Sequence, residues 1–135
     1  MVWRIEPIDV EDMLRREIMR MVPAVSVSAP PLAQTFQNHL PHVLVTRTGG
    51  SRLNMVIDQH AVSVDVRASS WSSAVTAANR IAGMVVSLPD DTEHLTQWRT
   101  VQITALPYSN PDPQHPTVPR VSFTALLTCR ATLTK

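Results

Sequence analysis

Five histidines and one cysteine are the side chains from which this chain would build a metal centre or a nucleophilic site. His39 and His42 are three residues apart, but Pro41 between them disfavours the helix that would turn both rings toward one ion. No carboxylate stands at a metal-ligand spacing such as His-Glu-x-x-His, and Asp112 and His115 share only a proline-rich segment. We therefore expect neither a bound metal nor a cofactor.

Cys129 is the only thiol of the chain. It falls on the apolar side of an alternating segment, and the sequence supplies no neighbouring base. A reactive cysteine needs a positive or basic neighbour and exposure to solvent. Cys129 is therefore expected to be a small buried side chain.

Asp58 and Asp65 are the carboxylates that would form a pair for general acid–base catalysis. Aromatic residues make up only 4% of the chain, which leaves little surface for stacking sugars or nucleic-acid bases. We expect both carboxylates to be solvated and the protein not to be an enzyme. A small metal-dependent hydrolase or nuclease that uses Asp58, Asp65 and a histidine is kept as an alternative.

The segment Gly49-Gly50-Ser51 has the composition of a phosphate-binding turn. A Walker motif, however, needs a Gly-Lys-Ser/Thr sequence at the start of a helix, and here no lysine follows and a strand is expected next. The segment is therefore interpreted as the turn of a hairpin.

The composition excludes several classes of protein. Twelve Lys and Arg residues against 11 Asp and Glu residues give a charge of +1, which argues against strong non-specific binding of nucleic acid. One cysteine excludes a disulfide framework and zinc sites built mainly from thiolates. No apolar run approaches the ~20 residues of a membrane span, and the first residues are too acidic for a signal peptide. We expect a soluble, cytosolic protein with a single domain, residues 1–135.

Two segments have the periodicity of helices. Residues 8–22 place Leu14 and Ile18 on one stripe, with acidic residues near the start and arginines near the end, as the helix dipole favours. Residues 69–88 begin at a serine that suits an N-cap and carry an alanine-rich stripe. The members of that stripe are Trp71, Ala74, Val75, Ala78, Ile81, Ala82, Val85 and Leu88.

Alternation of apolar and polar residues predicts strands at 42–48, 60–68, 97–106 and 118–132, and residues 25–27 fit a further short strand. Two of the three glycines fall within 48–58 and five prolines within 107–119, and both segments are predicted to be long loops. Strands that follow one another without a crossover helix favour antiparallel pairing. The expected fold class is α+β, with a single antiparallel or mixed β-sheet of about four to five strands and two helices packed on one face.

Four segments of the chain resemble the tail terminator (tail completion) proteins of long-tailed bacteriophages and of related phage-like particles. They are an acidic amphipathic helix beginning Ile8-Asp9-Val10-Glu11-Asp12-Met13-Leu14, a strand and glycine turn from His42 to Gly50, the valine strand 62–68 running into the alanine-rich helix, and Leu106-Pro107-Tyr108-Ser109-Asn110-Pro111-Asp112 followed by Pro119-Arg120-Val121-Ser122-Phe123-Thr124-Ala125. The resemblance covers nearly the whole chain, apart from residues 28–41.

The resemblance implies a structural protein of the virion, assembled in the cytoplasm of a bacterial host and located at the head-proximal end of the tail. Its subunits would close into a ring, usually a hexamer, that caps the tail tube and ends its polymerisation. Its partners would be other copies of itself, the major tail tube protein and the head–tail connector or stopper protein. DNA would pass through the lumen only as cargo, and no membrane would be involved.

Two sets of residues follow as predictions from this reading. The first would contact a neighbouring subunit or the tail tube, and the second would line the lumen on the polar face of the sheet. The contact set is Arg47, Arg52, Leu53, Asn54, Tyr108, Asn110, Asp112 and His115, and the lumen set is Asp65, Arg67, Thr124 and Arg130. A head-completion or connector-stopper protein, which also forms rings, is the alternative within the same class.

Overall fold

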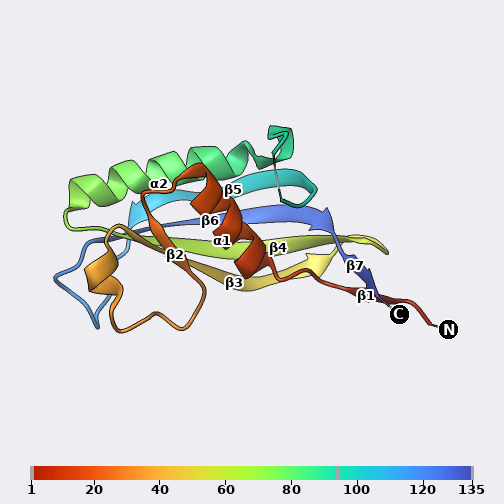
Figure 1. The fold of residues 1–135 in the computed structure, drawn as a ribbon, viewed down its shortest axis with the longest axis horizontal. Coiled ribbons are helices and arrows are strands. Elements are labelled where there is room, and N and C mark those ends of the chain that lie inside the picture. The colour runs from red at the N-terminus through yellow and green to blue at the C-terminus, as the bar shows by residue number, and fades with distance from the viewer. Residues whose placement is uncertain (1, 94, 135) are drawn as a thin grey trace.

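The computed structural model describes residues 2–93 and 95–134. Its body is a mixed five-stranded sheet with the strand order β2-β3-β4-β6-β5 (Figure 1). Strand β2 pairs parallel with β3, and all other pairs are antiparallel. The bounds are Ser26–Ser28 for β2, His42–Arg52 for β3, Ile57–Arg67 for β4, Trp98–Ser109 for β5 and Arg120–Arg130 for β6. The predicted α+β class is confirmed.

Two α-helices lie side by side on one face of this sheet (Figure 1). Helix α1 (Val10–Met21) begins at Asp9, whose Oδ1 accepts the N–H of Asp12 at 3.1 Å. Helix α2 (Trp71–Val86) begins at Ser70, whose Oγ accepts the N–H of Ser73 at 3.1 Å. Each capping side chain satisfies one of the free amides of the first turn. Among the described residues, neither helix has the length and apolar character needed to cross a membrane.

The smaller elements complete the fold. Short 3-10 helices follow β2 and α2, namely η1 (Phe36–His39) and η2 (Leu88–Asp90). A separate two-stranded sheet pairs β1 (Arg4–Glu6) with β7 (Thr132–Thr134) in antiparallel register. The sequence patterns do not predict this small sheet, because three-residue strands carry too little periodicity to be recognised.

The hydrophobic core fills the space between the sheet and the helices. Strand alternation turns Val62, Val64 and Val66 of β4 toward the helices, where each is almost fully buried. The small residues Ala74 and Ala78 let α2 approach the sheet closely, as predicted. The predicted burial is wrong for two members of the stripe, however, because Trp71 and Val75 remain 43% and 44% exposed on α2. The remaining stripe positions already cover the sheet, so these two side chains point outward.

Glu17 joins α1 to the segment that enters β5. Its side chain is fully buried, and its Oε2 accepts the indole N–H of Trp98 at 2.6 Å and the backbone N–H of Leu95 at 3.1 Å. Its Oε1 accepts from Arg20 at 3.1 Å, and Arg20 also donates to Asp91 at 2.8 Å. A buried carboxylate persists only when it is paired and hydrogen-bonded in this way.

The hairpin of β3 and β4 is longer than predicted. The proposed loop 48–58 is wrong, because β3 continues through Arg52 and β4 starts at Ile57. The two glycines lie inside β3, next to a shift of register between Arg47 and Gly49. Gly50 is required by the strand pairing itself, because a Cβ there would overlap the carbonyl oxygen of Gln59. Its φ of +140° also favours glycine.

The second predicted loop is also shorter than expected. Strand β5 continues through Pro107 to Ser109, so the connection to β6 covers residues 110–119 rather than 107–119. Proline is tolerated there because β5 is the last strand of the sheet and the ladder has shifts of register near Ala105.

Candidate functional site

The face of the sheet opposite the helices carries polar side chains in a row across β4, β6 and β5. Ser122 donates from Oγ to Asp65 Oδ1 at 2.6 Å, and the hydroxyls of Thr104 and Thr124 lie 2.6 Å apart. Arg130 is exposed at one end of β6. Three of the four predicted lumen residues therefore lie on this weakly charged face, where Asp65 and Thr124 are half-buried and Arg130 is exposed.

The prediction that Arg67 lines the lumen is wrong. Its side chain is only 3% exposed, so it lines no open surface. Its guanidinium lies 5.4 Å from the centroid of the Phe36 ring and donates to Asp112 Oδ2 at 3.2 Å. The segment 28–41, whose conformation the patterns leave open, folds over this end of the polar face and inserts Phe36 there. Sequence reasoning missed this because a lone phenylalanine among prolines carries no period.

The same cluster holds the proline-rich loop against the body of its own chain. The ring of His115 meets Phe36 edge-on, with 4.9 Å between centroids. Burial works against the charge of Asp112, but the backbone N–H of Gln114 and the side chains of Arg67 and Arg120 lower its pKa. The structure thus brings Asp112 and His115 together, and their contact with a partner stays a prediction.

Asn110 begins this loop, and Tyr108 lies just before it on β5. The side-chain amide of Asn110 donates to Ser122 Oγ at 3.1 Å, and the backbone carbonyl of Asn110 accepts from Arg120 Nε at 2.6 Å. Asn110 therefore extends the hydrogen-bonded row of the polar face. Tyr108 is 43% exposed on β5 and is free to contact a neighbour.

The tip of the β3–β4 hairpin exposes two apolar side chains. Leu53 is 53% and Met55 is 78% exposed, and sequence reasoning missed Met55. Asn54 holds the turn, since its Oδ1 accepts the N–H groups of Val56 and Ile57 at 3.0 Å each. Of the predicted contact residues here, Leu53 is available to a partner, whereas the side chain of Asn54 is used within the turn.

Arg52 is bonded within its own chain. Its Nε and Nη2 donate to the carboxylate of Asp58 at 2.7 and 3.1 Å, and its Nη1 donates to the carbonyl of Ile5 at 3.0 Å. The bonds from Arg52 lower the pKa of Asp58 despite its burial. Arg47, by contrast, uses its backbone N–H, which donates to Glu11 Oε2 at 2.8 Å.

An apolar strip beside the last strand of the sheet was not predicted. Val86 of α2 and Leu106 of β5, 45% and 76% exposed, line one hollow there, and we count with them Trp71 and Val75, which are 43% and 44% exposed along the same helix. The hollow has a volume of about 270 Å³ and lies between Gly83, Ile103 and Leu106. The signal available in the sequence was the excess of apolar residues in the stripe of α2, more than one face of a helix can bury.

The structure separates the two carboxylates considered for catalysis. Asp58 and Asp65 are seven positions apart on β4, so alternation places them on opposite faces of the sheet. Cys129 is buried as predicted, and burial raises the pKa of its thiol to about 11. Within residues 2–93 and 95–134, no three His, Cys, Asp or Glu side chains gather as metal ligands would.

Comparison with models of known protein families finds no match, and comparison with curated proteins finds none either. The function is therefore inferred from the surfaces of the chain itself.

Proposed function

We propose that this protein is a tail terminator, a subunit that closes with its copies into a ring on the end of a phage tail tube. One observation carries the proposal: the same subunit combines an open polar sheet face with an apolar strip beside an unpaired edge strand. The first suits the wall of a water-filled lumen, and the second suits contact between neighbours. The order of elements and the resemblance of four segments add to this support.

The edge strand is the natural start of the interface. Strand β5 has 12 residues, and among the described residues no other strand pairs with its outer side. Exposed edges of this kind associate with other chains unless they are covered. The opposite edge of the sheet differs, because the short strand β2 pairs only with His42–Leu44 of β3. Two unlike edges favour head-to-tail association, which closes into a ring when the rotation permits.

The polar face suits a channel through which DNA slides. It combines hydroxyls with both signs of charge, and Asp65 is tied to Ser122 rather than free. Many phosphate contacts would hold DNA in place, whereas a nearly neutral wall lets it pass.

The test mixes the purified protein with major tail tube protein and examines the tubes by negative-stain microscopy. Capped tubes of uniform length and a ring in native mass spectrometry are expected. Val75→Arg, in the apolar strip, should abolish the ring, whereas Met19→Arg on α1, equally exposed at 44%, should not. A protein that leaves the tubes uncapped and stays monomeric in their presence would refute the proposal.

A connector-stopper protein is the second candidate in the same class, and the same surfaces fit it. The partner distinguishes the two. A ring that binds portal or connector assemblies and leaves tube length unchanged would favour the stopper.

A further inference from the structure

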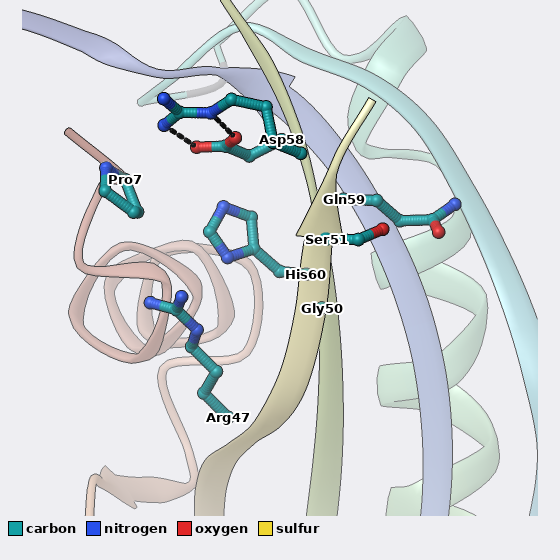
Figure 2. A pocket seen from close by; sticks show the side chains of 8 residues that line it. Pro7, Arg47, Gly50, Ser51, Asp58, Gln59 and His60 are labelled. Atoms are coloured by element: carbon teal, nitrogen blue, oxygen red, sulfur yellow. Dashed lines mark hydrogen bonds and ion pairs between the residues drawn. The ribbon is translucent and has the colours of Figure 1, made fainter. Parts of the chain in front are cut away.

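A pocket of about 330 Å³ lies on the helix side of the sheet, near the beginning of α1 (Figure 2). Its walls are formed by Pro7, Arg47 and the Arg52–Asp58 ion pair, and its floor by His60. The pocket belongs neither to the polar sheet face nor to the apolar strip. His60 lies opposite Leu127 in the sheet, and paired residues point to the same face, so its ring lies on the side of the core. It is at the small end of the range for ligand pockets.

His60 is the unusual member of this pocket. Its side chain is 1% exposed, yet neither ring nitrogen has a hydrogen-bond partner among the residues that the structure describes. Buried polar atoms are nearly always paired, and leaving one unpaired costs free energy. Burial first, and the charge of Arg47 second, lower the pKa of His60, so its ring is neutral at pH 7 and offers one donor and one acceptor.

The charges around the ring favour an anion. Figure 2 shows the imidazole between Arg47 on one side and the Arg52–Asp58 pair on the other. The carboxylate of Asp58 is already bonded by Arg52, at 2.7 Å. Arg47 is exposed, and no hydrogen bond or ion pair of its guanidinium occurs within the described ranges 2–93 and 95–134. Glu11 binds only the backbone N–H of Arg47, so the lining presents a guanidinium without a described bonding partner beside an unpaired N–H group.

We propose that this pocket binds a small oxyanion, a phosphate or a carboxylate, between the guanidinium of Arg47 and the ring of His60. One oxygen accepts from Arg47 and another from the protonated ring nitrogen of His60. Guanidinium groups bind both anions through charge-assisted hydrogen bonds. A cation is disfavoured, because two guanidiniums face a single carboxylate that is already paired. All the lining residues come from one chain, so binding can be measured without a partner.

The experiment follows the ring resonances of ¹⁵N-histidine-labelled protein at pH 7.5 during titration with sodium phosphate and, separately, sodium acetate. Chloride keeps the ionic strength constant. A saturable shift of the His60 signals is expected, and the anion with the lower half-saturation concentration identifies the geometry, tetrahedral or planar. Arg47→Gln should weaken binding about tenfold or more, the loss of one charge-assisted hydrogen bond.

The matched control is Arg99→Gln, an exposed arginine on β5 outside the pocket. It removes the same charge and should leave the affinity unchanged. Arg47 is exposed, so its variant is expected to fold, and the backbone amide spectrum checks this. The proposal is overturned if neither anion gives a saturable shift, or if Arg47→Gln and Arg99→Gln weaken binding equally, since the effect would then be general screening.

Discussion

Among single residues, Gly50 is a position where the backbone leaves no room for a side chain. A methyl group there would overlap the carbonyl oxygen of Gln59 on the paired strand, and the φ of +140° adds strain. Gly50→Ala should lower the free energy of unfolding by about 2 kcal/mol or more. Urea denaturation measures the change.

Gly49→Ala is the control for this prediction. Its φ is +153°, but a Cβ there meets nothing within 4 Å. The loss should be clearly smaller than for Gly50→Ala. Equal losses would show that backbone conformation alone, and not the contact with β4, fixes the glycine.

Two buried histidines make stability depend on pH. Burial, with Arg67 for His42 and Arg47 for His60, lowers both pKa values below 6.5. As the pH falls below 6.5, the unfolded chain therefore binds protons that the folded chain does not, and stability decreases until the folded pKa values are reached. Each histidine contributes at most ~1.4 kcal/mol per pH unit.

Urea denaturation between pH 7.5 and 5 tests this dependence. His42→Gln should reduce the slope, whereas His39→Gln, which removes only one of the contributions that lower the pKa of His42, should reduce it less. The same slope in both variants would contradict the assignment to buried rings.

How far the sequence predicted individual residues depends on what fixes each one. Cys129 and the polar row through Asp65 and Thr124 follow from alternation along a strand, which is a local property. The burial of Arg67 depends on Phe36, distant in sequence and drawn from a segment without a period. The pocket around His60 escaped prediction for the same reason, because it needs Pro7 and Arg47 from separate elements.

Among the contacts between elements, the hydrogen bond from Trp98 of β5 to Glu17 of α1 should contribute much of the free energy that holds the helix on the sheet. Glu17→Gln keeps the shape but removes the charge that Trp98 and Arg20 share, 2.6 and 3.1 Å from its oxygens. Breaking a buried pair leaves a guanidinium and two donors less well satisfied. We expect a loss of about 3 kcal/mol in the free energy of unfolding.

Glu93→Gln is the matched change on the same arginine. Its carboxylate lies 3.9 Å from Arg20 but is 83% exposed. The expected loss is within ~0.5 kcal/mol. Urea denaturation measures both losses. Losses of similar size would contradict the prediction, because the exposed ion pair would then stabilise the fold as much as the buried one.

The elements themselves were predictable where their period is long, as in α1, α2 and the centres of β3 to β6. Their ends were not. Glycine and proline indicate turns on average, yet here Gly49 and Gly50 lie in a strand with a register shift, and Pro107 lies in an edge strand. Pairing with a neighbouring strand overrides the local preference.

At the scale of the whole molecule, the weakly charged polar face should not retain DNA. In fluorescence anisotropy at 150 mM salt, duplex DNA is expected to bind with a Kd weaker than ~10⁻⁴ M. The double change Asp65→Arg and Thr124→Arg puts two arginines on this face and removes a carboxylate, and it should give tighter, salt-dependent binding. Tight binding by the unchanged protein would contradict a lumen through which DNA slides.

The pairing of β1 with β7 has a practical consequence. Arg4 lies opposite Thr134 in this small sheet, so the first and last described residues emerge together at one end of the subunit (Figure 1). In a closed ring, symmetry would place both ends of every copy at one height along the ring axis. A gold-labelled peptide tag fused to either end would therefore form a single layer, and its height in micrographs of capped tubes would show how the ring is oriented on the tube.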